Sequence, residues 1–287
     1  MKMTDPSGTE APSKVGSFLI WQQPHLIYLA ELLYRANPSE ELLKKYNSLI
    51  QETAEFMYSF ATYEEEHDRY VLKGAIPAQE TLRAAETVNP PFDLSYWHFA
   101  MQVAQTWRER TRMERVPEWD VLIEKLSPLA YNDEQLYLAA ETAVDTYKDI
   151  RFTSDHMAVL GAVGILPMNQ LIHAGYMKNT LHWIWDNWNW DKTWGWDYPM
   201  TAMNAARMGE PEKAVSALLM DKRTNTYLVN GHNYQDGRLR IYLPGNGGLL
   251  TTVAMMCAGW DGSEGNNPGF PKDGKWNVRW EGLQPLP

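Results

Sequence analysis

Segments with the periodicity of an amphipathic helix run through most of this chain, and the loops between them are alternately short and long. Apolar residues recur at three- and four-residue spacing in residues 24–36 and 40–60, with only Asn37-Pro38 and the predicted N-cap Ser39 between them. No alternation of strands with helices occurs. The pattern therefore predicts an all-α fold built from helical hairpins. Further helices are expected at 93–113, just after Pro117, and at 156–166, 169–185, 197–208, 211–220 and 249–258.

Charge and composition exclude several classes of protein. The chain has 26 basic and 36 acidic residues, a net charge of −10, which argues against binding to nucleic acid or to anionic membrane surfaces. No apolar run reaches the roughly 18 residues that a membrane span needs. The single cysteine, Cys257, excludes an intramolecular disulfide and a cysteine-based zinc site. The histidines are dispersed, and no nucleotide-binding or metalloprotease motif occurs, so we expect neither a metal nor a cofactor.

The sequence predicts three parts. Residues 1–17, rich in Pro, Gly and Ser, are expected to be a lead-in loop, and they contain no apolar segment typical of a signal peptide. Residues 18–262 are expected to form one helical barrel domain. The alternating residues in 263–287 predict a β tail packed on its outside. The compartment stays open, and a periplasmic or extracellular location is among the alternatives.

The first candidate for chemistry is an acid in a long loop. Residues 72–81 carry Glu80 as their single acid, flanked by small and apolar residues. A carboxyl group in such surroundings can keep its proton at neutral pH and serve as a general acid. The alternative is an ordinary acidic residue in the first turn of a helix that begins after Pro77.

The second candidate is the segment 183–197, in which six tryptophans alternate with Asp and Asn. Flat aromatic rings stack on the apolar faces of sugars, and the polar side chains between them can bind hydroxyl groups. A tryptophan-rich core is the alternative. Of the acids Asp186, Asp191 and Asp197, only Asp197 directly precedes a predicted helix, where it could equally be an N-cap.

Other polar residues cluster where helices are expected to begin. Each one alone is typical of a structural hydrogen bond, but their recurrence at several helix starts predicts that they line one pocket. What remains after the exclusions above is carboxylate chemistry in an aromatic pocket, which is how glycosidases work. These lining residues are Trp21, Gln23, His25, His156, Trp196, His232, Gln235 and Asn246.

Four blocks of sequence resemble, in order, the catalytic region of the six-hairpin (α/α)6-barrel glycoside hydrolases. The nearest are glycoside hydrolase families 65 and 95 and their uncharacterised bacterial relatives. The first block contains the residue that corresponds to the general acid of both families, Glu80. The blocks are YVLKGAIPAQE, SDHMAVLGAVGILP, TWGWDYPMTAMNAARMGEPEKA and NGHNYQ followed by YLPGNGGLLTTVAMM.

The resemblance implies a glycoside hydrolase that acts on the ends of glycans or oligosaccharides by an inverting mechanism. Glu80 would be the acid. Pro244 stands where family 95 has an Asp near the base position, so the base must come from elsewhere. Asp197 is the preferred candidate and Asp236 the other. Inversion requires carboxyl groups roughly 6.5–9.5 Å apart.

The resemblance also indicates how much of the barrel this chain contains. The full barrel has twelve helices, whereas the pattern predicts about nine, so we expect this chain to be the C-terminal part of the barrel. The expected partners are a carbohydrate substrate and either further copies of the chain in a homo-oligomer or an N-terminal portion of the barrel. Three other functions stay open on this scaffold: a non-catalytic carbohydrate-binding remnant, a phosphorylase, which needs no protein base, and a polysaccharide lyase that uses His156 or His232.

Overall fold

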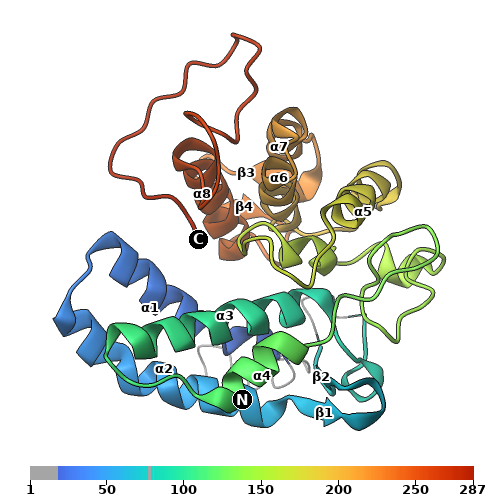
Figure 1. Ribbon diagram of the computed structural model, residues 1–287. Coiled ribbons are helices and arrows are strands. Elements are labelled where there is room, and N and C mark those ends of the chain that lie inside the picture. Colours follow the sequence, from blue (N-terminus) through green and yellow to red (C-terminus); the bar gives the residue numbers. More distant parts are fainter. Residues whose placement is uncertain (1–18, 77–78, 80) are drawn as a thin grey trace. The chain divides into compact units, whose positions relative to one another are not determined.

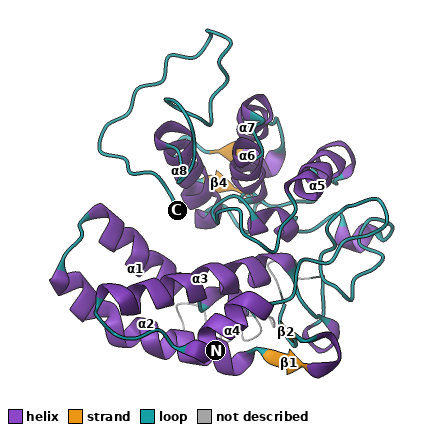
Figure 2. Ribbon diagram, viewed as in Figure 1, coloured by secondary structure: helices purple, strands orange, loops and turns teal. Residues whose placement is uncertain are grey.

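The computed structural model describes residues 19–76, 79 and 81–287 (Figure 1). In this part of the chain the regular structure is almost entirely helical, with two short two-stranded ribbons (Figure 2). The chain divides into two compact units. The first runs to Ala130 and also takes in Leu138–Val144, and the second comprises Tyr131–Tyr137 and Asp145–Pro287. Within the described residues, no helix combines the length and apolar character that crossing a membrane requires.

The first unit begins with the hairpin of α1 (His25–Ala36) and α2 (Glu40–Phe60). Ser39 caps α2, as predicted, because its hydroxyl oxygen accepts a hydrogen bond from the Leu42 amide at 3.2 Å. The short connection and the two apolar faces thus form the hairpin that the sequence pattern predicts.

Helix α3 (Pro91–Arg110) packs against both helices of this hairpin and is the central helix of the unit (Figure 1). Fourteen of its residues are buried, so it is covered on nearly all sides. Trp97 is fully buried, and its indole N–H donates to the Met57 carbonyl at 2.9 Å. This bond ties α3 to α2.

A ribbon of β1 (Thr62–Glu64) and β2 (Arg69–Val71) follows α2, and α4 (Pro117–Lys125) follows α3. The long loop after β2 is anchored by Asn89, whose side-chain oxygen accepts from the Leu72 amide at 2.9 Å. The Asn89 amide group donates to Glu141 at 2.7 Å. These bonds fix the two ends of the loop that contains the predicted acid Glu80, although Glu80 itself lies outside the described residues.

The second unit is built around α6 (Asp197–Arg207), which packs against α7 (Pro211–Leu218) and α8 (Leu243–Ala258). Helix α5 (Ala174–Asn187) also contacts α6. A ribbon of β3 (Thr226–Tyr227) and β4 (Asn233–Tyr234) precedes α8 (Figure 1). Nine of the eleven residues of α6 are buried, so its first turn lies well inside this unit.

Four local predictions were wrong. Helix α5 begins at Ala174, whereas the helix was expected to begin at Asn169. Residues 156–166 form only a 3-10 turn, Ala158–Ala162, which begins after Met157 and not at a cap by Asp155. Glycines at 161 and 164 weaken a longer helix there. Helix α8 begins at Leu243, earlier than predicted, because Pro244 is well suited to a first turn.

The predicted β tail is the last of the predictions that were wrong. Residues 275–280 form no strand, and Trp276 and Trp280 are 42% and 45% exposed, so the alternation buries no face. The end of the tail is attached instead by a bridge between Trp260 and Leu286 and by the Arg207 guanidinium, which donates to the Pro287 carbonyl at 2.6 Å. The assignment of residues 18–262 to one barrel domain stays a prediction, and the lead-in 1–17 lies outside the described residues.

Candidate functional site

Asp197 is the first residue of α6 and is completely buried in the second unit. The turn before the helix folds back on its carboxylate. Oδ2 accepts the Trp194 backbone N–H at 2.9 Å and also the Thr193 hydroxyl hydrogen. Hydrogen bonds of this kind hold a carboxylate in a fixed orientation and compensate its burial. The sequence alternative of an N-cap is thus replaced by a tighter arrangement in which the side chain binds the turn before the helix.

His156 lies against the same carboxylate. Its Nδ1 is 3.1 Å from Oδ2 and 3.3 Å from Oδ1 of Asp197, and the residue is only 5% exposed. The ring is flanked by Trp194, at a centroid distance of 5.5 Å, and edge-on by Trp196, at 4.8 Å. A buried acid, an imidazole and two indoles therefore form one cluster.

Two contacts converge on Nδ1 of His156, because the Trp196 indole N–H reaches it as well. One nitrogen cannot donate to Asp197 and accept from Trp196 at once. A bare Nδ1 would set its lone pair against those of a buried carboxylate, so we assign the hydrogen to Nδ1, donating to Asp197. With the hydrogen on Nδ1, the Trp196 N–H does not donate to that nitrogen, and Nε2 is the ring nitrogen that can accept.

The loop that carries these tryptophans is held from the other side by two amides. Gln235 Oε1 accepts from the Gly195 N–H at 3.2 Å, and its Nε2 donates to Asn233 Oδ1 at 3.1 Å. Asn233 fits so closely that a Cβ at Gly195 would lie 1.9 Å from its Oδ1, and one at Gly245 would lie 2.4 Å away. Only glycine allows this approach, so Gly195 fixes the backbone positions of Trp194 and Trp196.

The remaining predicted residues of the second unit lie in the same pair of loops. Asn246 accepts from the Asn233 N–H at 2.9 Å and donates to the Gly231 carbonyl at 2.8 Å. His232 is partly buried, and its Nδ1 is buried without a hydrogen-bond partner among the described residues. Asp236 accepts from the backbone N–H groups of Leu239 and Arg238, at 2.8 Å each, and these bonds lower its pKa. The alternative base is therefore occupied in closing a turn.

A second aromatic cluster lies in the first unit, where α1 and α3 begin. His25 Nδ1 is 2.6 Å from the Tyr96 hydroxyl. The Trp21 ring stands edge-on to His25 at a centroid distance of 5.4 Å and lies 6.1 Å from Phe92. Burial lowers the pKa of His25 and raises that of Tyr96, so both side chains are neutral at pH 7. Gln23, also predicted to line the pocket, is partly exposed beside them.

Two further titratable residues on α3 were not found by the sequence reasoning. Asp93 is completely buried, neither carboxyl oxygen has a hydrogen-bond partner among the described residues, and burial raises its pKa well above the usual range. His98 is 2% exposed, both ring nitrogens are unpaired there, and burial lowers its pKa to about 4. Their positions in the sequence are ordinary helical ones, so only burial distinguishes them.

The predicted site residues thus fall into two groups, each within one unit. Trp21, Gln23 and His25 cluster in the first unit, and His156, Trp196, Asp197, His232, Gln235 and Asn246 gather in the second. Glu80 is outside the described residues. That these residues together line one sugar-binding pocket stays a prediction.

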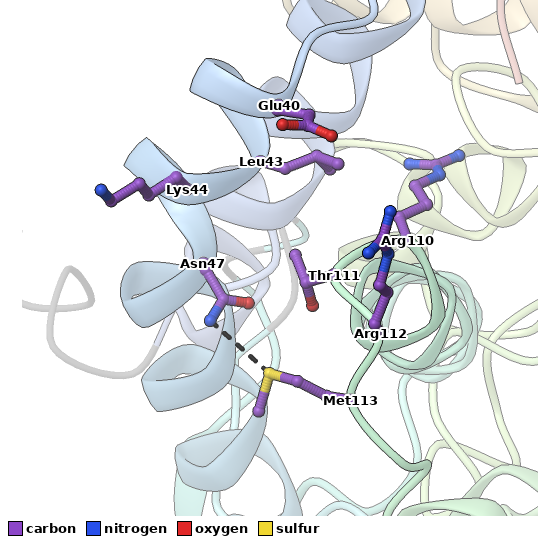
Figure 3. A pocket seen from close by; sticks show the side chains of 8 residues that line it. All are labelled: Glu40, Leu43, Lys44, Asn47, Arg110, Thr111, Arg112 and Met113. Atoms are coloured by element: carbon purple, nitrogen blue, oxygen red, sulfur yellow. Dashed lines mark hydrogen bonds between the residues drawn. The ribbon is translucent and has the colours of Figure 1, made fainter.

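A separate groove lies in the first unit between the start of α2 and the end of α3 (Figure 3). It has a cavity volume of about 460 Å³ and includes none of the predicted site residues. Arg110 in its wall pairs with Glu31, at 3.0 Å for one of two bonds, and Asn47 donates to the Met113 sulfur at 3.7 Å (Figure 3). Those contacts join helices and require no ligand. Among the described residues, no group of His, Cys, Asp and Glu could hold a metal ion.

Comparisons with known proteins bear on the fold. No family model matches the chain, and no curated protein matches it. Among solved structures, a putative kojibiose phosphorylase from the human microbiome superimposes with a TM-score of 0.61 at 10% sequence identity. The match covers 88% of this chain and 41% of that chain. The fold is of the (α/α)6-toroid type.

This likeness confirms the predicted all-α fold class and supports the resemblance to six-hairpin carbohydrate enzymes. At 10% identity it concerns the fold alone. The chain spans about two fifths of the length of the structure it matches. The nearness to family 95 and the bacterial origin stay predictions.

Proposed function

We propose that this chain is the barrel region of a glycoside hydrolase that acts on the ends of glycans or oligosaccharides with inversion. The observation that carries the proposal is the buried pair of Asp197 and His156 flanked by Trp194 and Trp196. A proton acceptor beside indole rings is the combination that sugar hydrolysis requires, because the rings can stack on the sugar while the acceptor activates water.

In the proposed reaction Glu80 gives its proton to the glycosidic oxygen as the bond from that oxygen to the anomeric carbon breaks. A water molecule attacks the same carbon from the opposite face and loses a proton. Because the oxygens of Asp197 are already engaged by Thr193, Trp194 and His156, we assign the acceptor of that proton to Nε2 of His156. Asp197 then stabilises the imidazolium that forms, as a carboxylate does in other acid–histidine pairs.

The test is a hydrolysis screen on chromogenic glycosides and on plant and host oligosaccharides. Glu80→Gln is compared with Glu86→Gln, a matched change at an exposed acid of the same segment. We expect Glu80→Gln to lower the rate roughly 10²–10⁴-fold, which is the usual contribution of a general acid, and Glu86→Gln to leave it unchanged. Full activity in the Glu80→Gln variant would contradict the assignment. Turnover that consumes phosphate, or a product that absorbs ultraviolet light, would indicate a phosphorylase or a lyase instead.

One observation favours a second candidate, a carbohydrate-binding domain without catalysis. Asp197 is completely buried and its oxygens are engaged, as in a purely structural role. This candidate predicts that sugars bind, that none is turned over, and that Glu80→Gln leaves the dissociation constant unchanged. Calorimetry identifies the sugars that bind, and the hydrolysis screen on the same sugars separates the two candidates by whether any is turned over.

A further inference from the structure

The hydrogen bond between His25 and Tyr96 has two chemically different forms. Either the Tyr96 hydroxyl donates to a bare Nδ1, or an Nδ1–H donates to the phenol oxygen. The two forms place the remaining ring hydrogen differently. In the first form Nε2 carries a hydrogen and donates, and in the second form Nε2 is bare and accepts.

Burial of the phenol decides between them. Tyr96 is 1% exposed, and among the described residues its hydroxyl forms a hydrogen bond with His25 alone. If Nδ1–H donated, the phenol hydrogen would be buried without an acceptor, which is unfavourable. Donation from Tyr96 satisfies both groups. The lowered pKa of His25 agrees with this form, because a doubly protonated ring could not accept.

The surroundings of His25 suit a ligand with an apolar face and hydroxyl groups. His25, Trp21 and Phe92 are each partly exposed, whereas Tyr96 behind them is buried. The Trp21 and Phe92 rings lie 6.1 Å apart and tilted, and His25 adjoins Trp21 edge-on. One donor beside such rings is the usual arrangement for binding a sugar hydroxyl next to a stacked ring.

We propose that Tyr96 is a positioning residue that holds His25 in the tautomer with hydrogen on Nε2, so that His25 donates to an oxygen of a sugar bound against Trp21. The sugar in this statement rests on the proposed function, whereas the tautomer does not. Tyr96 acts through His25 and does not itself touch the sugar.

The tautomer is tested first, by long-range ¹H–¹⁵N spectra of histidine-labelled protein, with the signal of His25 assigned from its loss in His25→Gln. We expect a hydrogen on Nε2 and a bare Nδ1 in the unsubstituted protein. In Tyr96→Phe we expect a mixture of tautomers and a shifted His25 signal. Tyr34→Phe removes a hydroxyl from α1 in the same unit and should leave the signal unchanged. A hydrogen on Nδ1, or no response to Tyr96→Phe, would overturn the proposal.

The sugar contact is tested with His25→Gln and His25→Asn, using the best ligand from the oligosaccharide panel. The Gln amide nitrogen can reach the position of Nε2, whereas that of Asn reaches the position of Nδ1. We expect His25→Asn to weaken binding about tenfold, the loss of one hydrogen bond, and His25→Gln to retain most of the affinity. In turnover, Tyr96→Phe should raise KM with little change in kcat.

The outcomes separate the two proposals. Equal affinity of the unsubstituted protein and both His25 variants would overturn the contact while leaving the proposed function intact. Absence of binding to every sugar, with the Nε2–H tautomer observed, would overturn the sugar contact together with the proposed function. In that case only the claim that Tyr96 holds His25 in the tautomer with hydrogen on Nε2 would stand.

Discussion

The two units each hold a histidine beside tryptophan with Nδ1 fixed by a buried partner, but the partners differ. In the first unit a phenol contacts Nδ1 of His25, and in the second a carboxylate contacts Nδ1 of His156. A buried hydroxyl gives its hydrogen away, so His25 is left as a donor at Nε2. A carboxylate takes a hydrogen, so His156 is left as an acceptor at Nε2. The same ring thus gains opposite chemistry from one neighbouring side chain.

Under the proposed function, the two tautomers divide sugar binding from catalysis. A neutral donor beside Trp21 suits the recognition of a hydroxyl group. An acceptor supported by a carboxylate suits the removal of a proton, because the charge that develops on the ring is already compensated. On the proposed function, we expect substitutions around His25 to change KM and those around His156 to change kcat.

The largest expected effect is at Asp197. Asp197→Asn removes the carboxylate that orients His156, so we expect kcat to fall roughly 10²–10⁴-fold while sugar affinity changes little. Asp186→Asn, at an exposed acid on α5, is the matched control and should keep full activity. Activity of Asp197→Asn within a few-fold of the unsubstituted protein would place the base elsewhere and break the contrast with His25.

A third histidine, His98, sharpens the comparison because it has neither kind of partner among the described residues. Its pKa is about 4 in the folded state and about 6.5 when unfolded. As the pH falls, the unfolded state therefore takes up this proton before the folded state does. The contribution of His98 to the free energy of unfolding is fully present above pH 6.5 and is lost as the pH falls toward 4. The loss amounts to up to about 3 kcal/mol. We expect this part of the loss to be absent in His98→Gln. Urea unfolding at pH 7 and pH 4.5 checks it, and parallel pH profiles for both proteins would refute it.

The loop that carries Trp194 and Trp196 offers a steric test of the second unit. A methyl group at Gly195 would collide with Asn233, so Gly195→Ala should lower the free energy of unfolding by about 1–3 kcal/mol and disturb both tryptophans. Gly247→Ala is the control, since no atom lies within 4 Å of the added carbon. Because Gly247 is inside α8, that change should stabilise by about 0.5–1 kcal/mol. Equal effects of the two substitutions would show that the close approach is unimportant.

Sequence reasoning was strongest where short-range rules decide. The hairpin of α1 and α2 followed from apolar spacing, and Ser39 from capping preference, since both depend on neighbouring residues. It failed at residues 156–166, where glycines reduce an apolar helix to a 3-10 turn, and at 275–280, where an alternating pattern has no partner strand.

The sites were only partly accessible from sequence for a similar reason. Composition drew attention to the tryptophan segment, and a position at a predicted helix start drew attention to His25 and His156. Neither signal could identify Tyr96 or Thr193, because their importance comes from contacts across 71 residues in one case and from the fold of a tight turn in the other. The tryptophan segment contains both core residues and candidate site residues. Trp188 and Trp190 are buried in the second unit. Trp194 and Trp196 are partly exposed and flank His156.

The most direct test of the contrast between the two units is one long-range ¹H–¹⁵N spectrum of the histidine-labelled chain at neutral pH. The two signals are assigned from their loss in His25→Gln and His156→Gln. We expect hydrogen on Nε2 of His25 and on Nδ1 of His156 in the same sample. The same tautomer for both rings would contradict the claim that the partner at Nδ1 divides them into a donor and an acceptor.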